Sequence, residues 1–194
     1  MPTLTVVAGP NGSGKSTLTQ SADFDGIERL LDPDAIARDL SPADPSAAAV
    51  AAGRKALQLT EEYLNAKVSL AVETTLAGHR IIVLMRTAKE RGYEVNLAFV
   101  ALNSPEKNIG RIRDRVARGG HFIPDLDVRR RYARSFANLP KAIRLADLAL
   151  LFDNSGDDAR PVLIAQSGKI VWQAKLLPEW LSGIRLDVSG SSQL

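Results

Sequence analysis

The chain alternates short, continuously apolar runs with longer amphipathic segments. Four runs rich in aliphatic and β-branched residues predict strands buried on both faces, at residues 4–8, 68–72, 93–102 and 148–152. A shorter run at residues 27–31 predicts one more strand. Continuous apolar runs separated by helices are typical of a parallel sheet with helices packed on its faces.

The segments between these runs carry helical periodicity. Val50, Leu57 and Leu64 recur every seven residues and give one apolar face to a long alanine-rich helix that ends near Asn65. Further helices are predicted directly after residues 9–17, over residues 35–40 and 81–91, from residue 105 to residues 119–120, and over residues 125–138 and 140–145.

The C-terminal part of the sequence has a different pattern. Residues 161–165 and 169–172 are short apolar runs joined by a Gln-Ser-Gly turn, which predicts a β-hairpin. At 194 residues the chain is long enough for one α/β domain and too short for two. We expect a single domain over residues 1–186, a mostly parallel five-stranded sheet with a C-terminal β-hairpin, and a disordered tail at residues 187–194.

Residues 9–17 fill every fixed position of the phosphate-binding loop, G-x-x-x-x-G-K-[ST]. At average composition a given position matches this pattern by chance roughly 3–4 times in 100,000. A predicted strand precedes the loop and a predicted helix follows it, which is the context that the motif requires. The residues predicted to bind a nucleoside triphosphate are Gly9, Pro10, Asn11, Gly12, Ser13, Gly14, Lys15, Ser16 and Thr17. The predicted fold is therefore the three-layer α/β fold of P-loop NTPases and kinases.

The chemistry of phosphate binding explains these residue types. Glycines let the backbone curl until several N–H groups point at phosphate oxygens, and the start of the following helix adds a positive field. We expect Lys15 to reach the β and γ phosphates and the Ser16 hydroxyl to ligate Mg²⁺. The sequence lacks the Asn-Lys-x-Asp motif that reads guanine. ATP with Mg²⁺ is therefore the predicted pair.

Carboxylates follow two of the predicted strands. Asp34 comes after residues 27–31, where it is also the expected N-cap of the helix at 35–40, and Glu73 comes after residues 68–72. Ligands of parallel α/β sheets bind beyond the carboxyl ends of the strands, so both side chains are expected near the loop. A kinase needs a base there to orient or deprotonate the acceptor hydroxyl, and Asp34 is the predicted base. Residues 149–153 have the shape of a Walker B strand ending in Asp153, but a solvated Asp-Asn turn is the commoner meaning.

The composition and the charge distribution exclude several kinds of site and of protein. The sequence has no cysteine, which excludes disulfides and thiolate metal sites and fits a reducing, cytoplasmic location. It has no apolar run long enough to predict a membrane span. The net charge is only +3, yet residues 106–134 hold nine basic and four acidic residues. Such a local cluster favours phosphate binding at one place rather than a nucleic-acid surface over the whole protein.

Six stretches of the chain, taken in order, resemble zeta-toxin proteins. They are residues 8–18 around the loop, 32–37 (Asp-Pro-Asp-Ala-Ile-Ala), 73–75 (Glu-Thr-Thr), 118–124 (Arg-Gly-Gly-His-Phe-Ile-Pro), 130–132 (Arg-Arg-Tyr) and 153–155 (Asp-Asn-Ser). The likeness extends over residues 3–155 and is stronger to the compact, chromosomal branch of zeta-like proteins than to the plasmid-borne toxins.

The resemblance implies a small-molecule kinase. Zeta toxins transfer the γ-phosphate of ATP to the 3′-hydroxyl of the sugar of UDP-N-acetylglucosamine, and a small antitoxin restrains them. By position, Asp34 would be the base, and Arg38, Glu73, Thr74 and Thr75 would bind the acceptor. Two positions depart from the founding toxins: Arg38 comes one residue later, and the third strand ends in Glu-Thr-Thr rather than Glu-Gly-Thr.

The basic segment at residues 105–138 is the predicted helical lid. A stripe of Ile109, Ile112 and Val116 is expected to be buried, and arginines lie roughly opposite it on the same helix. The arginines predicted to contact phosphate are Arg111, Arg115, Arg118, Arg130 and Arg131. Arg118, beside the glycine pair, is the first choice for the γ-phosphate, so that Lys15, Asp34 and Arg118 form the predicted catalytic set. A solvated basic face is the alternative for any single arginine.

Three other functions fit parts of the pattern. The acceptor could be another metabolite or a drug hydroxyl rather than a UDP-sugar. A nucleic-acid kinase or RNA-binding NTPase would use the basic lid on a phosphate backbone, although the lid has only Phe122, Tyr132 and Phe136 for base stacking. A nucleotide-bound switch would bind ATP and a protein partner without transferring phosphate.

Overall fold

The computed structural model describes residues 1–21, 29–45, 47–182 and 184. Within these residues the chain forms one seven-stranded sheet in the order β2-β3-β1-β4-β5-β6-β7. The strands are β1 (Thr3–Ala8), β2 (Arg29–Leu31), β3 (Leu70–Thr74), β4 (Glu94–Ala101), β5 (Leu148–Asp153), β6 (Arg160–Gln166) and β7 (Lys169–Gln173). The helices are α1 (Lys15–Ser21), α2 (Pro33–Leu40), α3 (Ala49–Ala66), α4 (His79–Glu90), α5 (Pro105–Ala117), α6 (Asp125–Leu145) and α7 (Glu179–Ser182).

The predicted α/β class with a mostly parallel sheet is confirmed, but the predicted number of five strands is wrong. Strands β2, β3, β1, β4 and β5 are parallel, as expected. The C-terminal hairpin is not separate from them, because β6 pairs antiparallel with β5 and β7 pairs with β6. Without β6, the outer edge of β5 would be unpaired. Strand β6 pairs with that edge, and its residues Val162, Leu163 and Ala165 are buried.

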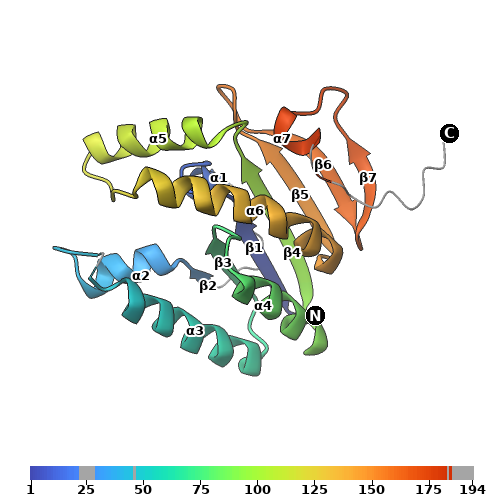
Figure 1. The fold of residues 1–194 in the computed structure, drawn as a ribbon. Coiled ribbons are helices and arrows are strands. Elements are labelled where there is room, and N and C mark those ends of the chain that lie inside the picture. Colours follow the sequence, from blue (N-terminus) through green and yellow to red (C-terminus); the bar gives the residue numbers. More distant parts are fainter. Residues whose placement is uncertain (22–28, 46, 183, 185–194) are drawn as a thin grey trace.

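Helices cover the sheet on the two faces that the connections dictate. The connection from β1 through α1 to β2 runs along the sheet in the opposite direction from the other parallel connections. Right-handed crossovers therefore place α1 on the face opposite α3, α4 and α6, which lie in front of the sheet in Figure 1. The largest buried cluster joins Leu64 of α3, Met85 of α4 and Leu139 of α6 to the strands.

The start of α2 differs from the prediction. The helix begins at Pro33, and its N-cap is Asp32, whose carboxylate accepts a hydrogen bond of 2.9 Å from the Asp34 backbone N–H. Proline suits the first helical position because its missing N–H needs no partner there. The cap was expected at Asp34, so the correction moves the capping role two residues back. The Asp34 carboxylate is thereby left for other contacts.

Helix α6 also differs from the prediction. Separate helices were expected on either side of Leu139, but one helix runs from Asp125 to Leu145 with Pro140 inside it. Proline at that position removes one backbone hydrogen bond. Leu139, Ala142 and Ile143 are fully buried around it, and this apolar burial outweighs the local cost.

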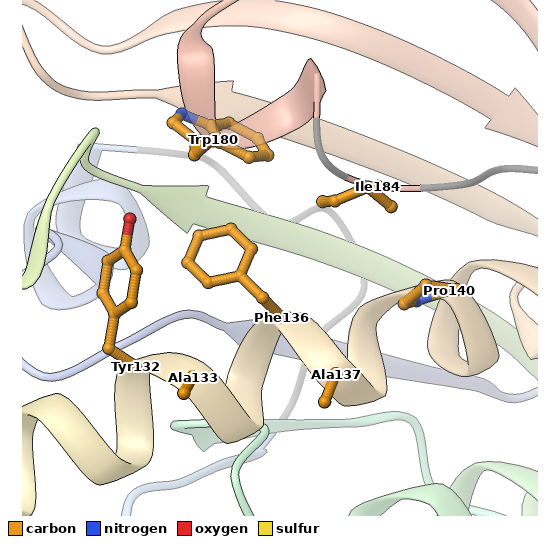
Figure 2. A pocket seen from close by; sticks show the side chains of 7 residues that line it. All are labelled: Tyr132, Ala133, Phe136, Ala137, Pro140, Trp180 and Ile184. Carbon is orange, nitrogen blue, oxygen red and sulfur yellow. The ribbon is translucent and has the colours of Figure 1, made fainter.

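Aromatic side chains join α6 to α7 and to β4. Tyr132 and Phe136 project from α6 towards Trp180 of α7, as Figure 2 shows. The ring centroids of Tyr132 and Phe136 lie 4.6 Å apart. Phe136 stands 5.6 Å from both Phe99 of β4 and Trp180. The cluster borders an open cavity of about 610 Å³. Its ring contacts pack the middle of α6 against β4.

Two predictions fall beyond this description. Residues 27–28 of the expected second strand and the expected tail at residues 187–194 lie outside the described residues. Among the described helices, none combines the length and apolar character that a membrane crossing requires.

One buried hydroxyl, directly before β4, contacts the C-terminal part of α3 and the segment before β3, and it allows a test of the packing. Tyr93 is only 3% exposed, and its Oη lies 2.9 Å from the Tyr63 carbonyl oxygen and 3.0 Å from that of Val68. We expect Tyr93→Phe to lower the free energy of unfolding by about 1–2 kcal/mol, because the Tyr63 and Val68 carbonyls each lose a hydrogen-bond donor. Urea denaturation measures the effect. Tyr63→Phe is the control, since the described structure records no hydrogen bond for that hydroxyl, and equal losses in both variants would contradict the assignment.

Candidate active site

The phosphate loop is folded tightly against its neighbours. Gly9 has a φ of 147°, and a Cβ at this position would lie 2.1 Å from the Val100 carbonyl oxygen of β4. Gly12 has a φ of 74°, and its Cβ would lie 2.8 Å from the Asn108 carbonyl oxygen of α5. Both positions therefore require glycine for conformation and for space.

Amide side chains hold the loop from outside. Asn108 is fully buried on α5 and donates a hydrogen bond of 2.6 Å to the Asn11 carbonyl oxygen. Asn154, directly after β5, donates a bond of 2.8 Å to the Ser13 carbonyl oxygen. These carbonyls are turned outward, which leaves the opposite side of the loop for N–H groups. The role of Asn108 could not be predicted from the sequence, where this residue is only one polar position beside the apolar stripe of α5.

Lys15 lies at the bottom of the loop. It is 8% exposed, and its Nζ donates a hydrogen bond of 3.2 Å to the Pro10 carbonyl oxygen. Burial lowers the pKa of this ammonium, while the nearby carboxylates of Glu73 and Asp34 act in the opposite direction. A buried ammonium whose hydrogen-bond partner is a neutral carbonyl is suited to bind an anion.

Glu73 lies beside the hydroxyl that the motif assigns to the metal. Ser16 Oγ is 3.2 Å from Glu73 Oε1 and 3.3 Å from Oε2. Burial raises the pKa of the Glu73 carboxyl, and Lys15 partly offsets that rise. The sheet explains this position, because β3 pairs directly with β1, so that the carboxyl end of β3 meets the loop that follows β1.

Asp153, the Walker B-like alternative in the sequence, is differently placed. It ends β5, which β4 separates from β1. Its carboxylate is 6% exposed and accepts hydrogen bonds from Ser155 Oγ at 2.6 Å and Trp180 Nε1 at 3.2 Å. It also pairs with Arg160 at 3.3 Å. Asp153 therefore joins the turn after β5 to α7.

Two adjoining cavities meet at two of the three predicted catalytic side chains, Lys15 and Asp34. One, of about 290 Å³, is lined by the loop together with Arg38, Arg111 and Arg115. The other, of about 210 Å³, is lined by Thr74, Thr75 and Arg131 among others. Residues that line both cavities are Asn11, Lys15, Asp32, Asp34 and Glu73. The junction therefore combines the Lys15 ammonium with three carboxylates, and arginines line the cavities on both sides of it.

The predicted lid arginines divide into two groups. Arg111 and Arg115 line the larger cavity, and each also donates a hydrogen bond of 2.8 Å, to the carbonyl oxygens of Asn154 and His121 respectively. Arg131 lines the smaller cavity and donates to Asn11 Oδ1 at 3.3 Å.

Arg118 and Arg130 line neither cavity. Arg118 is exposed at the C-terminal end of α5, directly before Gly119, whose φ is 86°. Arg130 is exposed and pairs with Asp127 at 2.8 Å. Arg118, the arginine predicted first to contact the γ-phosphate, therefore lies outside both cavities in this arrangement.

The remaining acceptor-side residues have local partners. Arg38 lies 3.6 Å from the Asp32 carboxylate. Thr74 Oγ1 accepts a hydrogen bond from the Leu76 N–H at 3.2 Å, and Thr75 Oγ1 accepts one from the Ala77 N–H at 3.4 Å. These contacts shape the turn between β3 and α4 along one wall of the smaller cavity.

The oxygen atoms of the site suit Mg²⁺. The Ser16 hydroxyl and the carboxylates of Glu73, Asp34 and Asp32 all line the larger cavity, and hard oxygen donors are what Mg²⁺ prefers. Within the described residues no three His, Cys, Asp or Glu side chains form a metal-binding group. The donor set fits an ion that relies on phosphate and water for most of its ligands.

The positions of Glu73 and Asp153 lead to a test of the metal partner. We expect Asp153→Ala to lower the free energy of unfolding by about 2–3 kcal/mol, because Trp180 and Ser155 lose a buried acceptor, and to leave MgATP affinity unchanged. Glu73→Gln should instead reduce the gain in ATP affinity that Mg²⁺ provides. Calorimetric titration with and without Mg²⁺ measures both effects. A lost Mg²⁺ dependence in Asp153→Ala alone would reverse the assignment.

The fold is similar to solved structures. The complex of AvrRxo1-ORF1 with AvrRxo1-ORF2, solved with ATP, matches at a TM-score of 0.69 with 17% identity, over 88% of this chain and 60% of that one. The PezAT chromosomal toxin-antitoxin system of Streptococcus pneumoniae matches at 0.56 with 18% identity, over 79% and 68%. A putative kinase from Chloroflexus aurantiacus matches at 0.54 with 22% identity, over 66% and 78%. The chain thus spans about 60% of the length of the AvrRxo1-ORF1 match.

Sequence comparisons give closer matches. An uncharacterized protein of Haemophilus influenzae is 43% identical over 124 residues, which cover 64% of this chain and 88% of that protein. The sequence model of the zeta toxin family matches residues 1–154, from β1 through the turn after β5. With that match and with the loop, Asp34 and Glu73 gathered at one end of the sheet, the chain belongs to the zeta toxin family.

Proposed function

We propose that this protein is an ATP-dependent phosphotransferase that moves the γ-phosphate of ATP to a hydroxyl group of a small molecule. One observation carries the proposal: Lys15, Asp34 and Glu73 line both of two adjoining cavities. A nucleotide in one cavity and an acceptor in the other would meet at these three side chains. A single kinase domain over residues 1–186 would hold both substrates.

The loop is the proposed nucleotide side. Its N–H groups and the start of α1 would bind the triphosphate, and Lys15 would contact the β and γ phosphates. Mg²⁺ would be held by Ser16, with Glu73 close enough to bind its water ligands, and would neutralise charge on the phosphates. On nucleotide binding, Lys15 would exchange the Pro10 carbonyl for phosphate oxygens, whose negative charge would satisfy its ammonium better.

Asp34 is the proposed base on the acceptor side. Since Asp32 caps α2, the Asp34 carboxylate is not needed for the cap and lines both cavities. As the acceptor oxygen bonds to the γ-phosphorus, the bond from that phosphorus to the oxygen of the departing ADP breaks. The hydroxyl proton passes to Asp34 and then to solvent. Arg38, Glu73, Thr74 and Thr75 would position the acceptor.

The lid would supply the cations that stabilise the transferred group. Arg111 and Arg115 already line the nucleotide cavity, and Arg131 lines the acceptor cavity. Arg118 and Arg130 would join them only if the segment around Gly119 moved. Positive charge aimed at the developing charge of the transition state is the main catalytic contribution that such side chains make.

The resemblance to zeta toxins makes the 3′-hydroxyl of the sugar of UDP-N-acetylglucosamine the first acceptor to test. The hydroxyl of another metabolite or of a drug is the alternative. Two of the matched structures come from a toxin-antitoxin system and from a two-protein complex. A small antitoxin protein is accordingly the proposed partner.

The two halves of the site have separate tests. We expect Lys15→Ala to weaken ATP binding and abolish transfer, since the phosphates lose their buried cation. Asp34→Asn should keep ATP affinity and lower kcat by about 10²–10⁴-fold, the usual contribution of a general base. Asp39→Asn, on the exposed side of the same helix, is the control. Near-normal acceptor phosphorylation by Asp34→Asn would show that the base is another residue.

The lid arginines can be ranked by comparing two positions on one helix. We expect Arg115→Ala to lower kcat/KM for ATP on the order of 10²-fold, as for loss of one group that stabilises transition-state charge. Arg118→Ala should have a smaller effect, because that side chain lines neither cavity. Steady-state kinetics at saturating acceptor give both values. A larger loss in Arg118→Ala would mean that the lid closes beyond the arrangement described above.

The experiment that tests the proposed function is a search for the phosphorylated acceptor. The protein is incubated with ATP, Mg²⁺ and separate acceptors, including UDP-N-acetylglucosamine, and the products are weighed by mass spectrometry. A gain of one phosphate on any acceptor, absent with Lys15→Ala, supports the kinase. Binding of ATP without transfer to any acceptor would favour a nucleotide-dependent switch.

A further inference from the structure

Besides the two cavities of the active site, another cavity lies next to the proposed acceptor site. It has a volume of about 470 Å³ and runs between α3 and α4 over the end of β3. We call it the α3–α4 groove. Its walls include the apolar side chains Ala56, Leu57, Leu64, Val72, Ile81 and Leu84. Its volume is in the range of cavities that bind small molecules.

The groove opens onto the catalytic side chains at one end. Pro33, Glu73 and Thr74 line the groove and also line the smaller cavity of the active site, which contains Asp34 and Lys15. Glu73 lines all three cavities. A molecule lying in the groove would therefore present one end to Glu73 and Asp34 while the rest of it lay between the helices.

The charges of the walls limit what the groove can bind. Among its described lining residues the charged ones are Glu61, Glu73 and Arg80. Glu61 forms an ion pair of 2.7 Å with Arg91, which does not line the groove. Among the described lining residues, the exposed Arg80 is therefore the cation. A diphosphate carries at least two negative charges and is usually bound by several cations or N–H groups. These walls do not offer such a set.

The buried hydroxyl of the groove wall has a partner of its own. Thr60, buried at the base of the groove, donates its hydroxyl hydrogen to the Ala56 carbonyl oxygen at 2.7 Å. At the rim, Leu57 and Val83 are each 46% exposed. Their apolar surface would be removed from water by an apolar ligand, which is the main source of affinity in such a site.

We propose that the α3–α4 groove holds the non-reacting body of the acceptor, and that this acceptor is an uncharged, largely apolar alcohol. Its hydroxyl passes Glu73 to reach Asp34, and its body fills the space between the helices. The inference rests on the proposed kinase function and narrows its acceptor class. It favours an apolar metabolite or drug hydroxyl over a nucleotide sugar.

Gly53 provides a way to fill the groove without breaking the fold. It lies on α3 and lines the groove, and a Cβ built at this position meets no atom within 4 Å. A leucine there would extend into open space. Replacing glycine inside a helix also raises helix propensity, so Gly53→Leu should not be less stable than the parent. Ala51→Leu, exposed on the same helix and outside the groove, is the matched control.

The test measures binding and turnover separately. 2-Phenylethanol, cyclohexylmethanol and 4-phenylbutan-1-ol are titrated into the full chain in the presence of MgADP, with methyl NMR to locate and quantify binding. We expect shifts at Leu57 and Leu84, and at least about tenfold weaker binding to Gly53→Leu, because the filled groove excludes the ligand. Ala51→Leu should bind the alcohols normally. With MgATP, the same alcohols should gain one phosphate on the parent protein, and the affinity for ATP, measured by calorimetric titration, should not change in Gly53→Leu.

The outcomes separate this inference from the function on which it rests. Phosphorylation of a UDP-sugar with no binding of the alcohols, or alcohol binding that Gly53→Leu leaves intact, overturns the groove as the acceptor site and keeps the kinase. Alcohol binding that Gly53→Leu abolishes, without phosphorylation of any compound, contradicts the kinase and the acceptor role together. Binding and phosphorylation that are both lost in Gly53→Leu alone support the inference.

Discussion

The close packing of the phosphate loop against β4 and α5 is the constraint on which the site depends. At Gly9 and Gly12 the backbone has positive φ and lies so near the Val100 and Asn108 carbonyls that no side chain fits. This packing ties the loop to α5, the helix that carries the first lid arginines. The phosphate loop and α5 therefore share one contact surface, with Asn108 as its buried polar link.

Strand order then decides which acidic residues can act. Because β3 lies next to β1, Glu73 reaches Ser16, whereas Asp153 on β5 is two strands away from β1 and is occupied by Trp180 and Ser155. The junction of the cavities at Lys15, Asp34 and Glu73 follows from the same order. A single rule of α/β sheets, that ligands bind beyond the carboxyl ends of neighbouring strands, accounts for the whole arrangement.

Much of this could be predicted from the sequence, and the failures have physical reasons. Continuous apolar runs located the parallel strands, and the loop motif located the nucleotide side. The number of strands was missed because hydrophobic pattern shows that β6 is buried but not which edge it covers. A helix break was wrongly predicted near Pro140. The free energy gained by burying Leu139, Ala142 and Ile143 outweighs the low helix propensity of proline. The cap at Asp32 was missed because two aspartates flank Pro33, and either could cap a helix.

The acceptor side was the least predictable from sequence. The α3–α4 groove is built from residues that are separate in the chain and individually ordinary for helices, so no motif reports it. We propose that this site transfers phosphate to an alcohol rather than to water. ³¹P NMR of the protein with ATP, Mg²⁺ and an acceptor distinguishes the two reactions. We predict that the γ-phosphate signal is replaced by a phosphomonoester signal; inorganic phosphate as the only product would contradict the account.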